Sequence, residues 1–438
     1  MKSLRWAALM GAAALALGEG LMAQDPASLD SLVADALVRS PTIVASQRRV
    51  DAARATAASA GSLDDPMLML GLMNQPIRGS MEDMTMRVLG VTQMIPFPGK
   101  RPLGRAAAAH ELAAAQAELE ASRRALVQEV KEAYYELAFV DRTLEVLRRN
   151  DLILGDFIEV TEARYGLGTG SQLDVLEARV ELAQLAAEAV ALQGGREAAL
   201  AGLNAALDRP TEAAVVAPRV PERIARAAVP ADPRQVRFTS AALGSRAAGS
   251  PLPPLAALQE QAIRDNPELL ARDAMIAAQA TRLDLARKAH LPDLDLSLQY
   301  GQRDGLSDLI SAVVSLPIPV RRGSRQDRER EEAEATLAAL QAERRAAANE
   351  VRAEVARAYA DSERARSQLA LFVTSILPQG RAALESATSS FQVGRGDFLT
   401  LLENQATLYG YETAYHRALT DFAIGLAKLE RLVGREIL

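Results

Sequence analysis

The chain has 438 residues, a formal net charge of −6 and no cysteine. The lack of cysteine excludes disulfides, thiolate chemistry and lipid attachment at a cysteine. The weak acidic charge, without a basic stripe, gives no sign of nucleic-acid binding. Aromatic residues make up only 4% of the chain, whereas apolar residues reach 49%, largely through Ala and Leu, which favours long and closely packed helices.

Residues 1–23 are predicted to be a secretory signal peptide. Lys2 and Arg5 give a basic start, and residues 6–17 form an apolar segment that is too short to span a bilayer as a helix. Residues 21–23 fit a cleavage site. We therefore expect an exported protein, found in the periplasm, in an outer membrane or outside the cell.

Residues 24–207 are predicted to form one unit of helices around a β-hairpin. A helix over residues 27–62 precedes residues 66–95, where prolines and glycines break the helix and polar and apolar residues alternate as in paired strands. A long helix follows and ends near Tyr165. The segment from Pro98 to Tyr165 would be roughly 100 Å long as a helix. After a break at residues 166–170, another helix reaches the end of the unit.

The rest of the chain repeats this order. A proline-rich linker is expected over residues 208–254, and residues 255–438 form the second unit, with a β-hairpin at 292–318 and a turn at 392–396. Pro378 predicts a kink in its long helix.

The two units match when the chain is shifted along itself by 226 positions. Glycines, prolines and acids then fall into register: Pro41 with Pro267, Gly168 with Gly394, Gly170 with Gly396, and Glu177 with Glu403. So long a period indicates duplication of a domain-sized unit. Each unit would supply one full-length helical column and one column of shorter helices laid end to end.

The four predicted strands are too few to close a barrel. Polar and apolar alternation suits a membrane barrel, which needs about eight strands at least, so the barrel would be shared: a dimer gives eight strands and a trimer gives twelve. The alternative is a pair of hairpins that cap a helical bundle without a pore.

Over nearly its whole mature length the chain resembles the TolC-type outer-membrane efflux proteins. The resemblance is carried by the segment Tyr165-Gly166-Leu167-Gly168-Thr169-Gly170, by its copy Phe391-Gln392-Val393-Gly394-Arg395-Gly396, and by the Pro-x-Pro exits from both hairpins. It implies a mainly α trimer, in which a periplasmic helical barrel joins a shared 12-stranded outer-membrane β-barrel. It further implies a passive duct that meets a periplasmic adaptor and an inner-membrane pump, with no cofactor and no enzymatic activity.

The glycine turns are the first candidate site. Gly168, Gly170, Gly394 and Gly396 permit a tight reversal between antiparallel helices. Under the resemblance, these turns form the periplasmic tip and dock the adaptor.

The residues after each turn are candidates for a pore constriction. Asp174, Glu177 and Glu403, repeated by threefold symmetry, would ring a narrow pore and favour cations, and Arg164 or Arg395 would pair them. The alternative is a solvated helix face. Two departures from the family bear on gating: Thr400 stands where close relatives often have an acid, and Phe391 lacks the hydroxyl of a tyrosine.

Methionines gather in the first hairpin. Seven of the eight that remain after signal removal lie between Met67 and Met94, and thioethers suit Cu(I) or Ag(I). Met81, Met84 and Met86 are the metal-ligand candidates, and this Met-rich hairpin resembles the heavy-metal efflux branch. The alternative is methionine as a flexible apolar filler that faces lipid.

Two functions therefore remain open. The first is an outer-membrane exit duct, with copper or silver among its candidate cargoes. The second is a periplasmic helical bundle with a structural or interaction role and no pore.

Overall fold

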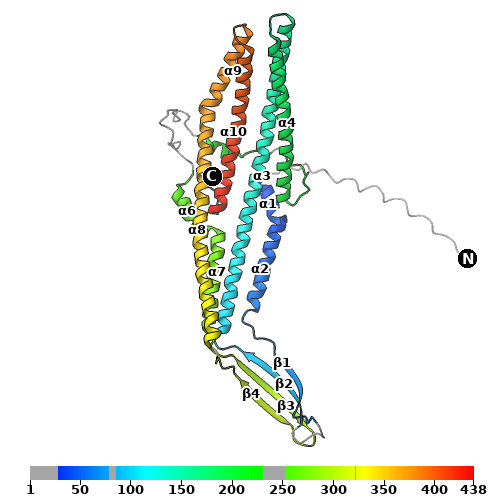
Figure 1. Ribbon diagram of the computed structural model, residues 1–438, viewed down its shortest axis with the longest axis vertical. Helices are drawn as coiled ribbons and strands as arrows, with labels where there is room; N and C mark the ends of the chain where they lie inside the picture. The colour runs from blue at the N-terminus through cyan, green and yellow to red at the C-terminus, as the bar shows by residue number, and fades with distance from the viewer. Residues whose placement is uncertain (1–27, 78–84, 217, 230–251, 321) are drawn as a thin grey trace, which may run out of the picture.

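The first repeat builds two helical columns, one from a single helix and one from shorter helices. In the computed structural model, which describes residues 28–77, 85–216, 218–229, 252–320 and 322–438, α3 spans Lys100–Gly166 and runs almost the full height of the helical part (Figure 1). α4 (Gln172–Ala206) packs along its upper half, and α1 (Leu29–Arg39) and α2 (Pro41–Ser59) pack along its lower half. The predicted signal peptide lies outside the described residues.

The second repeat has the same two columns. Its long column is continuous from Gln326 to Gln392. Its other column consists of the helices before the long column, within residues 255–287, and the helix after it, residues 398–433. The elements are α6 (Leu255–Asp265), α7 (Pro267–Arg287), the short 3₁₀ turn Arg322–Ser324, α8 (Gln326–Leu371), the π-helical turn Phe372–Ile376, α9 (Leu377–Gln392) and α10 (Phe398–Val433).

Proline begins the second short helix in each repeat. Pro41 and Pro267 occupy the first turn of α2 and α7, where the backbone N–H has no helical partner and the fixed φ of proline costs nothing. Asn266 caps α7 by accepting a 2.9 Å hydrogen bond from the Glu268 backbone N–H. The interruption predicted at Pro41 is therefore a break between two helices.

The kink predicted from Pro378 takes the form of a π-helical turn. Residues 372–376 are π-helical within an otherwise α-helical column, and Pro378 follows as the second residue of α9. Proline cannot donate the helical hydrogen bond, and its ring crowds the carbonyl four residues earlier. A wider turn relieves that clash while the column continues.

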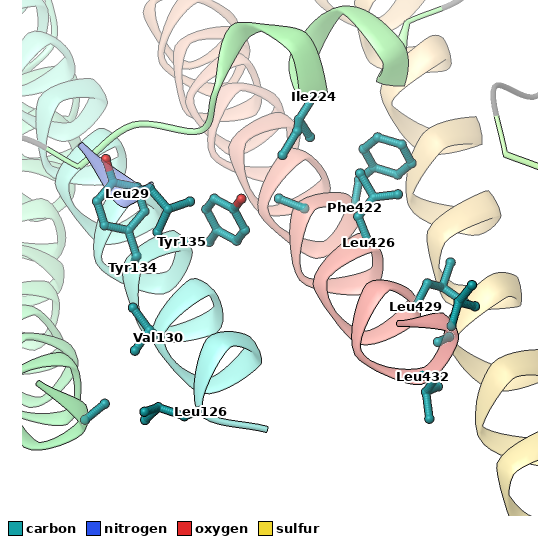
Figure 2. Close-up of a cluster of buried hydrophobic side chains, with 14 of the residues drawn as sticks. Leu29, Leu126, Val130, Tyr134, Tyr135, Ile224, Phe422, Leu426, Leu429 and Leu432 are labelled. Atoms are coloured by element: carbon teal, nitrogen blue, oxygen red, sulfur yellow. The ribbon is translucent and has the colours of Figure 1, made fainter. Parts of the chain in front are cut away.

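The main core lies where the short helices meet the long ones. In this core Tyr135 of α3 points toward α10, whereas Tyr134 lies beside Leu29 of α1 (Figure 2), and Phe422 and Leu426 of α10 belong to the same buried cluster. A further helix, α5 (Glu222–Ala228), lies within the predicted linker and buries Ile224 in the same core. The described part of residues 208–254 thus also closes one side of the core.

The strands of both repeats form one antiparallel sheet at the lower end of the molecule. The order is β1-β2-β3-β4, and β2 pairs with β3, so the sheet joins the two repeats. Thr92 donates a 3.1 Å hydrogen bond from its hydroxyl to Ser297 across this junction. The strands are β1 (Met67–Met73), β2 (Met86–Ile95), β3 (Leu294–Arg303) and β4 (Leu309–Ser315).

These elements confirm the predicted fold class, a mainly helical chain with a duplicated long-helix unit and a small sheet. Among the described helices, none is both long and apolar enough to cross a bilayer.

Candidate functional site

The two glycine turns lie together at the end of the molecule farthest from the sheet. One joins α3 to α4 and the other joins α9 to α10, and both stand at the top of the helical columns (Figure 1). We call them tip 1 (residues 163–174) and tip 2 (residues 389–400).

Tip 1 is a compact loop in which a single backbone carbonyl accepts two hydrogen bonds. The backbone N–H groups of Thr169 and Gly170 both donate to the carbonyl oxygen of Arg164, at 2.9 and 3.0 Å. The next helix then begins at once, since the Ser171 side chain accepts a 3.0 Å hydrogen bond from the Leu173 N–H.

Tip 2 repeats this bonding at the duplicated positions. The N–H groups of Arg395 and Gly396 both donate to the Ser390 carbonyl oxygen, each at 2.9 Å. Asp397 occupies the cap position of α10 without a side-chain hydrogen bond there. The duplication therefore preserved the loop geometry and changed its cap.

The four predicted glycines serve two different purposes. Gly168 and Gly394 have positive φ values of 72° and 71°, a conformation that strains any residue with a Cβ. Gly170 and Gly396 are required for space, because a Cβ there would lie 3.0 Å from Tyr165 N and 2.8 Å from Phe391 N respectively. Both pairs thus fix a sharp helix reversal at each tip.

The candidate constriction residues stand on the first turns of the descending helices. Asp174 and Glu177 are half-buried on α4, whereas Thr400 and Glu403 are exposed on α10. Each pair is three residues apart and therefore shares one face of its helix. Their positions beside the tips agree with the sequence prediction, and their role in a pore remains a prediction.

The predicted pairing of these acids with arginine is not present within the chain. Arg164 instead places its guanidinium carbon 4.5 Å from the centre of the Phe391 ring. In the part of the chain that the structure describes, no ion pair joins Arg164 or Arg395 to Asp174, Glu177 or Glu403. Local spacing had put opposite charges within reach, but the packing of tip 1 against tip 2 turns Arg164 toward an aromatic ring.

Below the tips lies a buried polar contact that sequence reasoning missed. Gln405 of α10 donates its side-chain N–H to the amide oxygen of Asn150 on α3, and both residues are about 5% exposed or less. Nearby, Glu412 accepts hydrogen bonds from Arg149 of α3 and Arg381 of α9. Polar residues thus tie three helices of the upper half together.

His416 lies on α10 within the same region. Its ring packs edge-on against Tyr415, with the ring centres 5.2 Å apart. Burial, together with the positive charge of Arg142, holds the pKa of His416 below its ordinary value.

The sheet has two chemically different faces. Strand register places one set of residues on the same face, and each of them is 43–77% exposed. This apolar face comprises Leu68, Leu70, Leu72, Leu89, Val91, Leu298, Tyr300, Ile310 and Val314.

The methionines occupy the opposite face. Most other residues of that face are polar or glycine, including Thr92, Ser297, Gln299 and Ser311. The described methionines of the sheet therefore do not share the apolar face, and their role, as ligands or as lipid-facing filler, stays a prediction. They are Met67, Met69, Met73, Met86 and Met94.

Of the three metal-ligand candidates, only Met86 can be placed. Met81 and Met84 lie outside the described residues. The described residues contain no group of three or more histidines and acids suited to holding a metal ion.

Comparison with known protein families gives a match over most of the chain. The family model described as outer membrane efflux protein matches residues 32–209 and 258–435, one segment for each repeat. Among curated proteins, no match was found.

Several solved structures with the same fold are outer-membrane proteins. The outer membrane protein VceC from Vibrio cholerae is 20% identical, with a TM-score of 0.75 over 94% of this chain and 97% of that chain. The outer-membrane channel OprN is 21% identical, with a TM-score of 0.75 over 94% and 90% of the two chains. The Campylobacter jejuni CmeC outer membrane channel is 14% identical, with a TM-score of 0.74 over 93% and 85%.

Proposed function

Because the chain belongs to the outer membrane efflux protein family, we propose that it is the outer-membrane exit duct of a tripartite efflux system. Three copies form one tube that passively exports substrates delivered by a periplasmic adaptor and an inner-membrane pump. The family consists of channel and transport proteins, and the proposed activity is conduction without a chemical step.

The observation that carries this proposal is the open sheet. β1 and β4 are its outer strands, so each presents an edge that no other strand of the sheet covers. Its apolar face is exposed along all four strands. A membrane requires that backbone edges be paired and that apolar side chains face lipid, and three such sheets closed edge to edge make a twelve-stranded barrel.

The tips are the proposed docking surface for the adaptor. They lie at the end opposite the sheet, which is the periplasmic end if the sheet is in the outer membrane (Figure 1). Leu167 and Val393 project from the two loops and are 79% and 68% exposed, so each tip offers a small apolar knob. Gly168, Gly170, Gly394 and Gly396 hold these knobs in place.

The acids after the tips are the proposed constriction. In a trimer, Asp174, Glu177 and Glu403 would each occur three times around the narrow end, with Thr400 beside them. A ring of carboxylates attracts cations and repels anions. The copper or silver cargo proposed from the methionines is compatible with such a ring.

The test is the oligomeric state and location of the protein. Mass measurement in mild detergent should return three copies, and the protein should remain in the detergent-extracted outer-membrane fraction. The rival function, a periplasmic bundle without a pore, requires a protein released with the soluble periplasmic fraction that gives no conductance in planar bilayers. Either of those results would reject the duct.

A further inference from the structure

The described methionines of the sheet all lie on one face of it, and of the levels from Met94 to Met86 only the Gly71–Val88 level between them has no thioether. Strand pairing sets Met73 directly opposite Met86, and it puts Met67, Met69 and Met94 on the same face at other levels of the sheet. We call these five residues the thioether ladder. They come from two strands, and the alternation of side chains along each strand keeps them together.

The surroundings of the ladder are those of a water-facing surface. Met67 and Thr92 are a cross-strand pair, and Thr92 in turn pairs with Ser297. Met69 is in the same row of paired positions as Gln299 and Ser311. Contact with lipid would account for methionines on the apolar face, but it does not account for methionines among hydroxyl and amide side chains.

Glycines on neighbouring strands make room for two of the thioethers. A Cβ at Gly301 would lie 2.8 Å from the sulfur of Met86, and a Cβ at Gly90 would lie 3.3 Å from the terminal methyl group of Met69. Each side chain therefore lies across the adjacent strand, over a position that has no side chain. Met86 thus places its sulfur against the sheet surface on the β3 side of its own strand.

The ladder extends over much of the height of the sheet. Met94 and Met86 are eight residues apart on β2, which corresponds to roughly 27 Å at 3.4 Å per residue. Because strands of a membrane barrel tilt by about 40°, that length covers roughly 20 Å of the hydrocarbon core, which is about 30 Å thick. Met67 and Met69 lie at intermediate levels, so successive thioethers are spaced along the proposed membrane crossing.

The chemistry of these side chains selects soft cations. Neutral thioethers bind Cu(I) and Ag(I) and have little affinity for Mg²⁺, Ca²⁺ or Zn²⁺, which prefer oxygen, imidazole or thiolate ligands. The chain has no cysteine that would hold a soft ion too tightly to release it. Several weak sites in series let an ion enter and leave, which is the requirement for conduction.

We propose that the thioether ladder lines the inside of the duct and passes Cu(I) or Ag(I) from one thioether level to the next. Met73 and Met86 occupy paired positions at one level of the ladder, and the other three methionines lie at separate levels. This inference rests on the proposed duct and names the surface that handles its proposed cargo.

The experiment compares silver binding by the purified wild-type protein and by a variant with all five ladder methionines changed to leucine. Leucine keeps the apolar volume and removes the sulfur. Ag(I) is the probe because it needs no reductant, and calorimetric titration in detergent measures its affinity and stoichiometry. Met81 and Met84 are retained in both proteins, and Met275→Leu on α7 is the matched control.

We expect the five-leucine variant to bind Ag(I) at least about tenfold more weakly or at fewer sites, while Met275→Leu binds as the wild type does. Equal binding by the wild type and the five-leucine variant would overturn the ladder. Planar-bilayer conductance of the same proteins separates this failure from failure of the duct: a variant that conducts but binds silver normally rejects only the ladder. A wild-type protein that does not conduct at all rejects the duct and, with it, the ladder.

Discussion

The guanidinium of Arg164 in tip 1 lies over the ring of Phe391 in tip 2, 4.5 Å from its centre. Phe391 is itself buried and lies against Phe398, with ring centres 5.7 Å apart. The two helical hairpins are therefore joined at their tips by an aromatic and cationic contact. This contact gives a physical reason for an aromatic residue at position 391.

The first prediction concerns this contact between the tips. Arg164→Gln removes the charge over the ring and should weaken the contact by about 0.5–1 kcal/mol. Native-state hydrogen exchange should then be roughly two- to fivefold faster at the turn amides of residues 165–170 and 391–396. Arg395→Gln is the control, since Arg395 is exposed and has no ion pair within the described chain. Equal exchange rates in the two variants would show that the contact does not hold the tips.

The second prediction concerns the turn glycines. Gly168→Val combined with Gly394→Val forces a β-branched residue into positive φ twice, at a cost of about 1–3 kcal/mol per site. Since only the loops are strained, export should be lost while the trimer remains intact by mass measurement. Gly166→Val is the control, because Gly166 lies in the helix without a positive φ and has open space around its Cβ position. If export survives the double change, the tips are not the docking surface.

The third prediction concerns the acids of the proposed constriction. Changing Asp174 and Glu403 together to Ala should weaken cation selectivity in planar bilayers and alter the resting conductance, because like charges in a confined throat act strongly on passing ions. Reversal potentials in a salt gradient measure the selectivity. Glu385→Ala provides a control acid on α9, away from the first turns after the tips. A reversal potential that does not move would mean that these acids are merely solvated.

The fourth prediction concerns the buried amides. Gln405→Leu leaves the amide of Asn150 without its partner in an apolar setting, which should cost about 1–3 kcal/mol of unfolding free energy. Adding Asn150→Leu removes the orphaned group, so the double variant should recover part of that loss. Chemical denaturation of the four proteins of this cycle gives the coupling. Simple additivity of the two losses would show that the amides do not depend on each other.

The fifth prediction concerns acidification. The pKa of His416 is lowered from 6.5 in the folded protein, mainly by burial, so the unfolded imidazole takes up a proton at higher pH than the folded one. Above pH 6.5 both forms are neutral and there is no effect. As the pH falls below 6.5, protonation favours the unfolded state, so the free energy of unfolding decreases. His416→Gln should make thermal unfolding midpoints less sensitive to pH between 7.5 and 5.

His110→Gln is the matched control for this measurement, since it removes a histidine from α3 instead of α10. We expect the control to keep the wild-type dependence on pH. If the unfolding midpoint of His416→Gln depends on pH as that of the wild type does, groups other than His416 cause the loss of stability.

Much of the fold followed from local sequence signals. Helix length depends on unbroken runs of helix-forming residues, and the helix ends follow from proline and glycine, so the long columns and both tips could be predicted. The positive φ of Gly168 and Gly394 is likewise a local property, and the duplication at 226 positions identified them twice. The resemblance to the efflux family rested on these same turns.

The tertiary structure decided which residues meet. Asn150 and Gln405 are 255 positions apart, and Arg164 and Phe391 are 227 apart, so no local pattern pairs them. Within the described chain Arg164 accordingly lies over Phe391, and its pairing with acids in an assembled pore stays a prediction. Strand register, which is set by pairing across the whole sheet, places the described methionines of the sheet on its polar face. A shift of one residue in pairing reverses the face of every side chain, so the sequence determined the strands and only the assembled sheet determined what they present.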